Sequence, residues 1–313
     1  MKTIINNYKR TVFFILLGIS LPFLSWSQQD SEYTQYMYNT VTVNPAYAGN
    51  RGVLSFNSLY RSQWTGLNGA PNSLTFSVNS PVGERGVGLG LSIIHDEVGP
   101  STESNITVDF SYTIPLNLKT KLSFGLKGGI NLLNVDFGKL DIRDRSELEF
   151  SQNIENRFSP NTGLGVYLHF DDRWYVGLSS PNILSTDHYD DAISSTASEK
   201  AHFYLISGYV FEINRGLKFK PAILTKAVKG APLAFDASAN FLFNERFTLG
   251  LSYRLDAAVS ALVGFQINNR FMLGYSYDYD TTELGNYNSG SHDFFLRFEF
   301  TKKTINSINP RFF

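Results

Sequence analysis

Five histidines are the residues of this sequence best suited to acid–base chemistry, because imidazole titrates near neutral pH. They are His95, His169, His188, His202 and His292. A serine nucleophile needs a histidine within hydrogen-bond reach and a third group that orients the ring. No short motif marks such a constellation, so we predict no catalytic residue. A serine or aspartate at bonding distance from His95, His169 or His202 would instead indicate a lipase-like enzyme.

Metal chemistry has one candidate segment, Asp187–Asp191, which offers carboxylate and imidazole ligands. It lacks the spacing of a calcium-binding loop, and we interpret it as a solvated external loop. The mixed charge run Asp141–Glu147 also indicates a wet loop. The chain has no cysteine, which excludes disulfides, thiolate metal sites and a lipid-acceptor thiol. We predict no metal and no cofactor.

The glycine-rich run Gly86–Gly90 superficially resembles a nucleotide-binding loop. It lies within an expected strand and not before a helix, so no helix N-terminus is present to hold a phosphate. Small residues that face a lumen explain it better. Lys127 and Arg297 lie on polar strand faces, where they either line the lumen or pair with Asp109 and Glu299.

Composition excludes several classes of protein. The chain has 313 residues, of which 42% are hydrophobic, and a mean hydropathy of −0.14. It has no run of roughly 18 apolar residues, which argues against a bundle of membrane helices. It is too apolar for a disordered chain. A formal net charge of −1 without a basic cluster argues against binding of nucleic acid.

The N-terminus has the features of an export signal. Lys2, Lys9 and Arg10 precede the apolar stretch Val12–Leu24, and Ser25 and Ser27 are the small residues that a signal peptidase reads. We predict cleavage after Ser27, so that residues 1–27 form a signal peptide. An uncleaved anchor helix is the alternative.

Beyond the signal, apolar and polar residues alternate with a period of two, the pattern of strands with one apolar and one polar face. Fourteen segments of this kind follow from about residue 52 onward, most of about 8 to 13 residues, long enough to cross hydrocarbon when tilted. They centre on residues 53–60, 72–80, 86–95, 103–114, 120–135, 161–170, 173–179, 201–213, 216–225, 232–242, 246–254, 257–267, 270–280 and 291–301.

Three features favour a membrane barrel over a soluble sandwich. The polar faces are rich in glycine, where a soluble protein would show Lys and Glu. Aromatic residues stand near segment ends, as an interfacial girdle requires; they include Tyr60, Trp174, Phe271 and Phe300. A meander of this length closes most simply on itself, which removes its edges. We predict an all-β, antiparallel transmembrane β-barrel of the outer membrane.

Connection lengths support this prediction. Tight turns at residues 171–172, 214–215, 244–245 and 268–269 alternate with longer connections at 136–160, 181–200, 225–231 and 281–290. Outer-membrane barrels have short periplasmic turns and longer external loops. By parity, Gln63–Pro71 and Asp96–Thr102 also lie outside, and both termini lie in the periplasm. The strands at Gly216–Thr225, which contains Pro221, and Arg173–Ser179 are the weakest, and an error there would give 12 or 13 strands.

The domain organisation follows from these segments. After the signal peptide come an N-terminal segment at residues 28–51, the barrel at 52–301 and a periplasmic tail at 302–313. Tyr33, Tyr36, Met37 and Tyr38 make the N-terminal segment too aromatic for a loose tail. We interpret it as periplasmic or packed in the lumen, with a simple lead-in to the first strand as the alternative.

Ten short stretches together resemble the PorP/SprF family of outer-membrane proteins. They are Gln35–Asn39, Asn44–Gly49, Tyr60–Trp64, Gly69–Pro71, Ser80–Pro81, Gly88–Leu91, Val98–Pro100, Val228–Pro232, Gly274–Tyr279 and Ser289–His292. They keep the family's order over essentially the whole mature chain. The external loops at 137–158 and 185–199 are the least family-like parts.

The resemblance implies an outer-membrane component of the type IX secretion system that serves protein export and, in gliding bacteria, motility. It implies protein partners, either the secretion machinery or a large secreted adhesin, besides the lipid bilayer. It implies no catalytic residues and no small-molecule substrate. A channel for hydrophobic solutes and an outer-membrane enzyme are the alternatives.

Overall fold

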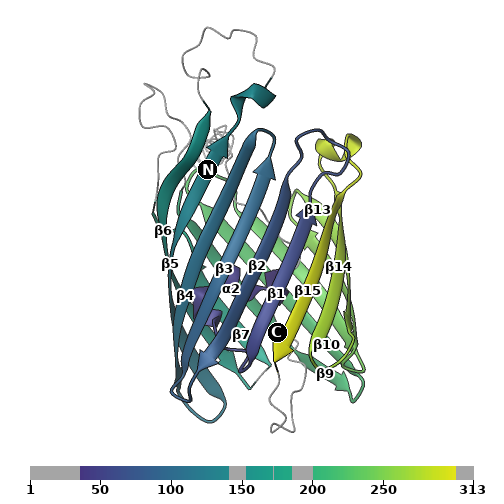
Figure 1. Cartoon of the computed structure of the whole chain (residues 1–313). Helices are drawn as coiled ribbons and strands as arrows, with labels where there is room; N and C mark the ends of the chain where they lie inside the picture. The colour runs from purple at the N-terminus through teal and green to yellow at the C-terminus, as the bar shows by residue number, and fades with distance from the viewer. Residues whose placement is uncertain (1–35, 141–152, 172, 185–199, 301–313) are drawn as a thin grey trace, which may run out of the picture.

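A computed structural model describes residues 36–140, 153–171, 173–184 and 200–300. Its strands form one antiparallel sheet (Figure 1). They are β1 (Leu54–Ser62), β2 (Asn72–Val82), β3 (Val87–Val98), β4 (Ser101–Pro115), β5 (Thr120–Val135), β6 (Ile154–Phe170), β7 (Trp174–Ser180), β8 (His202–Tyr209), β9 (Phe211–Asn214), β10 (Leu217–Val228), β11 (Ala234–Phe243), β12 (Phe247–Arg254), β13 (Ala258–Gln266), β14 (Phe271–Asp280) and β15 (Ser291–Phe300). Among the described residues, no helix is long and apolar enough to cross a membrane.

The sheet closes into a barrel because β1 pairs with β15 as well as with β2. β8 and β9 are two parts of one strand, since Gly208 pairs with Ala222 and Phe211 with Phe219 in one continuous register along β10. Pro221 lies between these pairs and has no N–H to give to the ladder. The barrel therefore has fourteen strands, as predicted, and the doubtful segment with Pro221 is one of them.

The two ends of the barrel differ in their connections (Figure 1). At the short-turn end, the connections are residues 83–86, 116–119, 171–173, 215–216, 244–246 and 267–270. The long-loop end carries the connections after β1, β5, β7, β10 and β14, together with two tight ones after β3 and β12. The predicted alternation holds apart from these two tight turns.

Two predicted loops are shorter than expected. β6 begins at Ile154, within the predicted connection 136–160. β3 and β4 run through most of Asp96–Thr102, and only Gly99 and Pro100 lie between them. These strand ends lie outside the apolar belt, so they carry no alternating pattern. They stay in the sheet because the neighbouring strand offers backbone partners.

Apolar side chains cover the outside of the barrel, and polar side chains face its interior. On β4, Val108, Phe110 and Tyr112 are exposed, whereas Asp109 and Ser111 are fully buried. The predicted end-of-strand aromatics Tyr60, Trp174, Phe271 and Phe300 all lie on the outer face. In lipid an apolar outer face is favourable, and the closed ladder satisfies the backbone.

Candidate functional site: the plugged lumen

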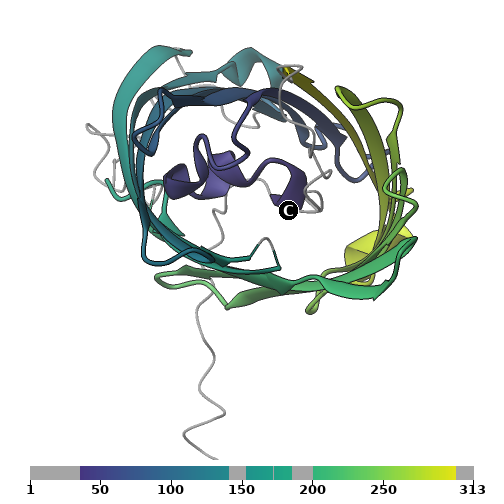
Figure 2. The ribbon, with the colours of Figure 1, turned by 90° about the horizontal axis from the view of Figure 1, so that it is seen from below.

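The N-terminal residues Tyr36–Asn50, called the plug below, lie inside the ring of strands (Figure 2). The plug consists of η1 (Tyr36–Tyr38), α2 (Thr40–Val43) and η2 (Pro45–Tyr47). Asn44 begins η2: its side-chain oxygen accepts a hydrogen bond from the Ala46 N–H at 3.0 Å, and Pro45 fits the first helical position. Ala46 and Asn44 are fully buried. Residues 28–35 lie outside the described part of the chain.

Glycines of the wall make room for the plug near the short-turn end. A Cβ on Gly125 of β5 would overlap the backbone of Ala46. A Cβ on Gly88 of β3 would overlap the carbonyl group of Ala48. Only glycine lets two backbones approach so closely. The sequence indicated that small residues face the lumen. The structure shows that Gly88 and Gly125 face the backbone of the plug.

Hydrogen bonds from four strands hold the plug. The Ser77 hydroxyl donates to Asn39 Oδ1 at 2.7 Å, and Ser111 donates to the Ala48 carbonyl at 2.6 Å. On the other side of the plug, Ser179 donates to the Val43 carbonyl at 2.7 Å, and the Asn44 amide donates to the Val166 carbonyl at 3.1 Å. Buried polar groups are costly unless they find partners. These serines therefore give buried polar groups of the plug, both backbone and side chain, a partner on the wall.

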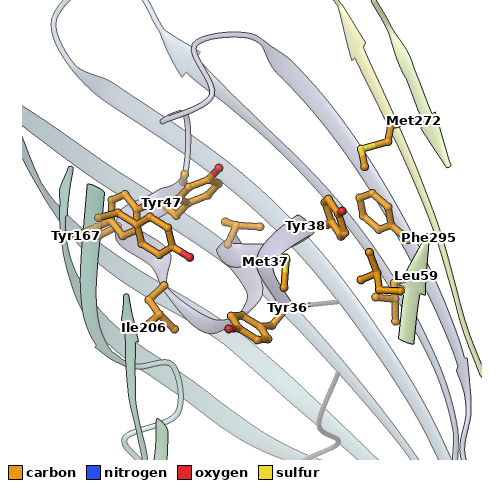
Figure 3. Close-up of a cluster of buried hydrophobic side chains, with 14 residues drawn as sticks. Tyr36, Met37, Tyr38, Tyr47, Leu59, Tyr167, Ile206, Met272 and Phe295 are labelled. Carbon is orange, nitrogen blue, oxygen red and sulfur yellow. The ribbon is translucent and has the colours of Figure 1, made fainter. Parts of the chain in front are cut away.

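Aromatic contacts fix the plug at both of its ends (Figure 3). Tyr38 stacks on Phe295 with ring centroids 5.0 Å apart, and Tyr47 meets Tyr167 edge-on at 5.3 Å. Such pairs add about 0.5–1.5 kcal/mol beyond the area that they bury. Burial raises the pKa of Tyr38 to about 12, so its phenol stays neutral at physiological pH.

The polar wall is paired internally. Lys127 lies 3.2 Å from Asp109 and also donates to the Thr42 carbonyl of the plug at 3.3 Å. Arg297 lies 3.6 Å from Glu299, which also bonds to Arg51 immediately after the plug. Of the two alternatives left open by the sequence, pairing with Asp109 and Glu299 is therefore present, and all four side chains are buried. Burial alone would lower the pKa of Arg51, but the Glu299 carboxylate raises it above its ordinary value.

A third buried charge cluster lies toward the long-loop end. Arg61 of β1 donates to Asp278 of β14 at 2.9 Å and to Asp293 of β15 at 2.6 Å. The flanking loops pair nearby, since the Thr65 N–H donates to the Gly290 carbonyl at 2.8 Å. Sequence reasoning did not single out this cluster. Its only signal was that all three residues fall on polar strand faces.

The histidines do not converge on one site. His95 Nδ1 lies 2.8 Å from the Ser104 hydroxyl, which is the contact that a lipase-like enzyme requires. The two residues are cross-strand partners on β3 and β4, on the outer face of the barrel. No carboxylate within the described ranges hydrogen-bonds to His95 to orient it. We therefore interpret the contact as a cross-strand pair.

The other histidines also occupy separate places. His292 Nδ1 lies 2.8 Å from the Tyr275 hydroxyl on the outer face, and His202 is buried on β8. His169 is near the ring of Tyr167 on β6. His188, with the rest of Asp187–Asp191, lies outside the described residues, as does Asp141–Glu147. In the part of the chain that the structure describes, no group of three or more His, Asp or Glu could hold a metal ion.

The run Gly86–Gly90 lies in the β2–β3 turn and the start of β3. It precedes no helix, so it offers no phosphate-binding geometry. Instead, Gly88 contacts the plug, and a Cβ on Gly90 would meet Asp109. The run therefore belongs to the wall of the lumen.

A closed antiparallel barrel with an apolar outer belt and an occupied polar lumen is an outer-membrane β-barrel protein. The sequence matches the family described as type IX secretion system membrane protein PorP/SprF over residues 25–298. The chain belongs to this family, and its place is the outer membrane. The fold and the family are those of a secretion-system membrane barrel and not of a class of enzymes.

Solved outer-membrane barrels resemble the chain distantly. Omp33 of Acinetobacter baumannii is 9% identical, with a TM-score of 0.47 over 80% of this chain and 100% of that one. The Ralstonia pickettii toluene transporter TbuX is 12% identical, with a TM-score of 0.48 over 82% and 92%. The monoaromatic hydrocarbon channel CymD is 13% identical, with a TM-score of 0.48 over 88% and 95%. No curated protein resembles the sequence closely enough to count as a match.

Proposed function

We propose that this protein is a non-enzymatic component of the type IX secretion system that binds a protein partner in or at the outer membrane. The partner is the secretion machinery or a large secreted adhesin, whose export or surface attachment the barrel supports. In a gliding bacterium the same role would serve motility. The observation that carries the proposal is membership of the PorP/SprF family over residues 25–298 in a barrel whose lumen holds a plug.

The plugged lumen supports a binding role over transport. Many of its polar side chains bond to the plug or to one another, as the contacts of Ser111, Lys127 and Arg61 illustrate. A diffusive channel needs groups that hold passing solutes only weakly. A channel for hydrophobic solutes is the alternative function, and it would require the plug to move.

The test is a clean deletion in the native host, complemented with the tagged protein, followed by crosslinking in intact cells. We expect type IX cargo in the medium or on the surface to fall after deletion. We also expect secretion machinery or one large surface protein to co-purify with the barrel. Unimpaired export in a host with no redundant paralogue would refute the proposal. Conductance or a bound lipid-like ligand in the purified barrel would favour the channel.

We also propose that residues 1–27 are removed during export and that both ends of the mature chain lie in the periplasm. The basic and apolar segments before Ser25–Ser27 support the cleavage, and the even strand count supports the placement of the ends. N-terminal sequencing of protein from outer membranes should begin at Gln28. A chain that begins at Met1 would indicate an uncleaved anchor.

A further inference from the structure

Three buried cations meet in the lumen near the short-turn end. Arg51 directly follows the plug, Arg297 lies near the end of β15 and Lys220 lies near the start of β10. The charges of Arg51 and Arg297 act on Lys220, so the three groups lie close together. Glu299 pairs with both arginines. These four residues, called the cation cluster below, carry three positive charges and one negative charge.

Arg297 keeps one donor of this cluster in reserve. Its Nε lies 3.6 Å from Glu299, and its Nη2 donates to the sulfur of Met272 at 3.0 Å. Its Nη1 is buried and has no hydrogen-bond partner among the described residues. A buried donor without a partner is costly, and a thioether is only a weak acceptor. Arg297 therefore needs a further acceptor, and the charge of the cluster favours an anionic one.

The plug begins beside the cation cluster (Figure 3). Tyr36, the first residue that the structure describes, has its hydroxyl near Ser238 of β11. Ser238 lies one inward position along β11 from the cross-strand partner of Lys220. Two residues later, the ring centroid of Tyr38 lies 6.0 Å from the guanidinium of Arg297. The chain before Tyr36 therefore starts between the two walls that carry Lys220 and Arg297.

Residues 28–35, which directly precede the plug, carry the complementary charge. Asp30 and Glu32 are the acidic residues of this segment, and it has no basic residue. An extended chain of four to six residues spans up to about 14 to 22 Å, which is enough for both carboxylates to reach the cluster from Tyr36. The tail 302–313 begins at the same end of the barrel, but it has three basic residues and no acidic one.

We propose that the carboxylates of Asp30 and Glu32 bind the cation cluster, where they accept hydrogen bonds from Arg297 and Lys220. The segment 28–35 then continues the plug toward the short-turn end. An acidic peptide of another protein is a poorer occupant, because a segment joined to the plug has a far higher effective concentration at the cluster. Lys226, the other fully buried lysine of β10, lies toward the long-loop end and is not part of this site.

Zero-length crosslinking tests the contact in the native sequence. A water-soluble carbodiimide joins a carboxylate to a lysine amine only where the two groups touch. The full-length protein in outer-membrane fragments should give a crosslinked peptide that joins Lys220 to Asp30 or Glu32. A crosslink from Lys220 to the tail 302–313 or to another protein would assign the cluster to that occupant and overturn the inference. Absence of any crosslink from Lys220 would overturn it too.

Thiol labelling measures whether the cluster holds the segment. Since the chain has no cysteine, Ser31→Cys places a unique thiol between the two carboxylates. A water-soluble maleimide should label it slowly in outer-membrane fragments. Lys220→Met should raise the labelling rate about tenfold or more, because a buried charge-assisted pair is lost. Lys226→Met is the matched control on the same inner face of β10, and it should leave the rate unchanged.

A second variant repeats this measurement without any change in the barrel wall. Asp30→Asn with Glu32→Gln should also raise the labelling rate of Ser31→Cys about tenfold or more, at an unchanged amount of barrel in the outer membrane. Rapid labelling of Ser31→Cys alone would refute the inference, as would equal rates in the Lys220→Met and Lys226→Met proteins. None of these readouts depends on export, so a failure here leaves the proposed function standing.

Discussion

Gly125 is a position where the plug and the wall leave no room for a side chain. A Cβ there overlaps the backbone of both Pro45 and Ala46. Backbone on either side cannot swing away as the end of a flexible side chain can. Gly125→Val should therefore be incompatible with the docked plug unless the plug or β5 shifts.

The free-energy cost of Gly125→Val can be judged from the atoms that the new side chain would overlap. Overpacking an interior costs about 1–3 kcal/mol, and overlap with two backbone segments places Gly125→Val at the upper end. About 3 kcal/mol corresponds to a fall of roughly a hundredfold in the ratio of docked to displaced plug. Gly128 on the same strand is the matched control, because a Cβ there meets nothing within 4 Å.

The assay uses the absence of cysteine from the chain. Val41→Cys places a single thiol in the plug at a side chain that is only 1% exposed. A water-soluble maleimide should label it slowly in outer-membrane vesicles. The label should enter up to about a hundredfold faster when Gly125→Val is added, and at the original rate with Gly128→Val. Equal labelling rates in the Gly125→Val and Gly128→Val proteins would refute the reasoning.

Three further predictions concern the charges and the outer-face histidine. Arg61→Ala leaves Asp278 and Asp293 buried without their cation, which should lower the free energy of unfolding by about 3–5 kcal/mol; an unchanged denaturant midpoint would contradict this. Lys127→Met and Asp109→Asn should be coupled by about 0.5–3 kcal/mol in a double-mutant cycle, because the two side chains lie 3.2 Å apart; strictly additive effects would argue against a working pair. His95→Ala should change stability by about 0.5 kcal/mol or less and leave export intact; loss of a phospholipase activity on this substitution would instead make His95 and Ser104 catalytic.

The strands were predictable because their signal is local. Alternation along β4, for example, follows directly from the two environments of a barrel wall. The sequence could suggest the pairing of Lys127 with Asp109, because the two residues are cross-strand partners on adjacent strands. Local pattern and neighbour pairing together account for the fold class and the strand count.

The remaining features depend on distant parts of the chain. β6 begins at Ile154 because Val135 of β5 pairs with it, and no apolar pattern marks that stretch. Arg61 meets Asp278 and Asp293, which are 217 and 232 residues away. The composition of the N-terminal segment indicated packing, but its place in the lumen depends on contacts with strands far apart in the sequence, from β2 to β15. These features arise when the barrel closes and brings distant segments together, and a local sequence pattern does not encode that.

The contacts of the plug bear directly on the choice between binding and transport. Four hydrogen bonds to the wall, from Ser77, Ser111, Ser179 and Asn44, each contribute about 0.5–1.5 kcal/mol. The stacking of Tyr38 on Phe295 adds about 0.5 kcal/mol or more. These contacts favour the docked plug, against the conformational entropy that ordering the segment costs. A solute could cross the barrel only by passing or displacing this plug. A protein partner at the rim meets its surface in every molecule, and this difference favours the binding role.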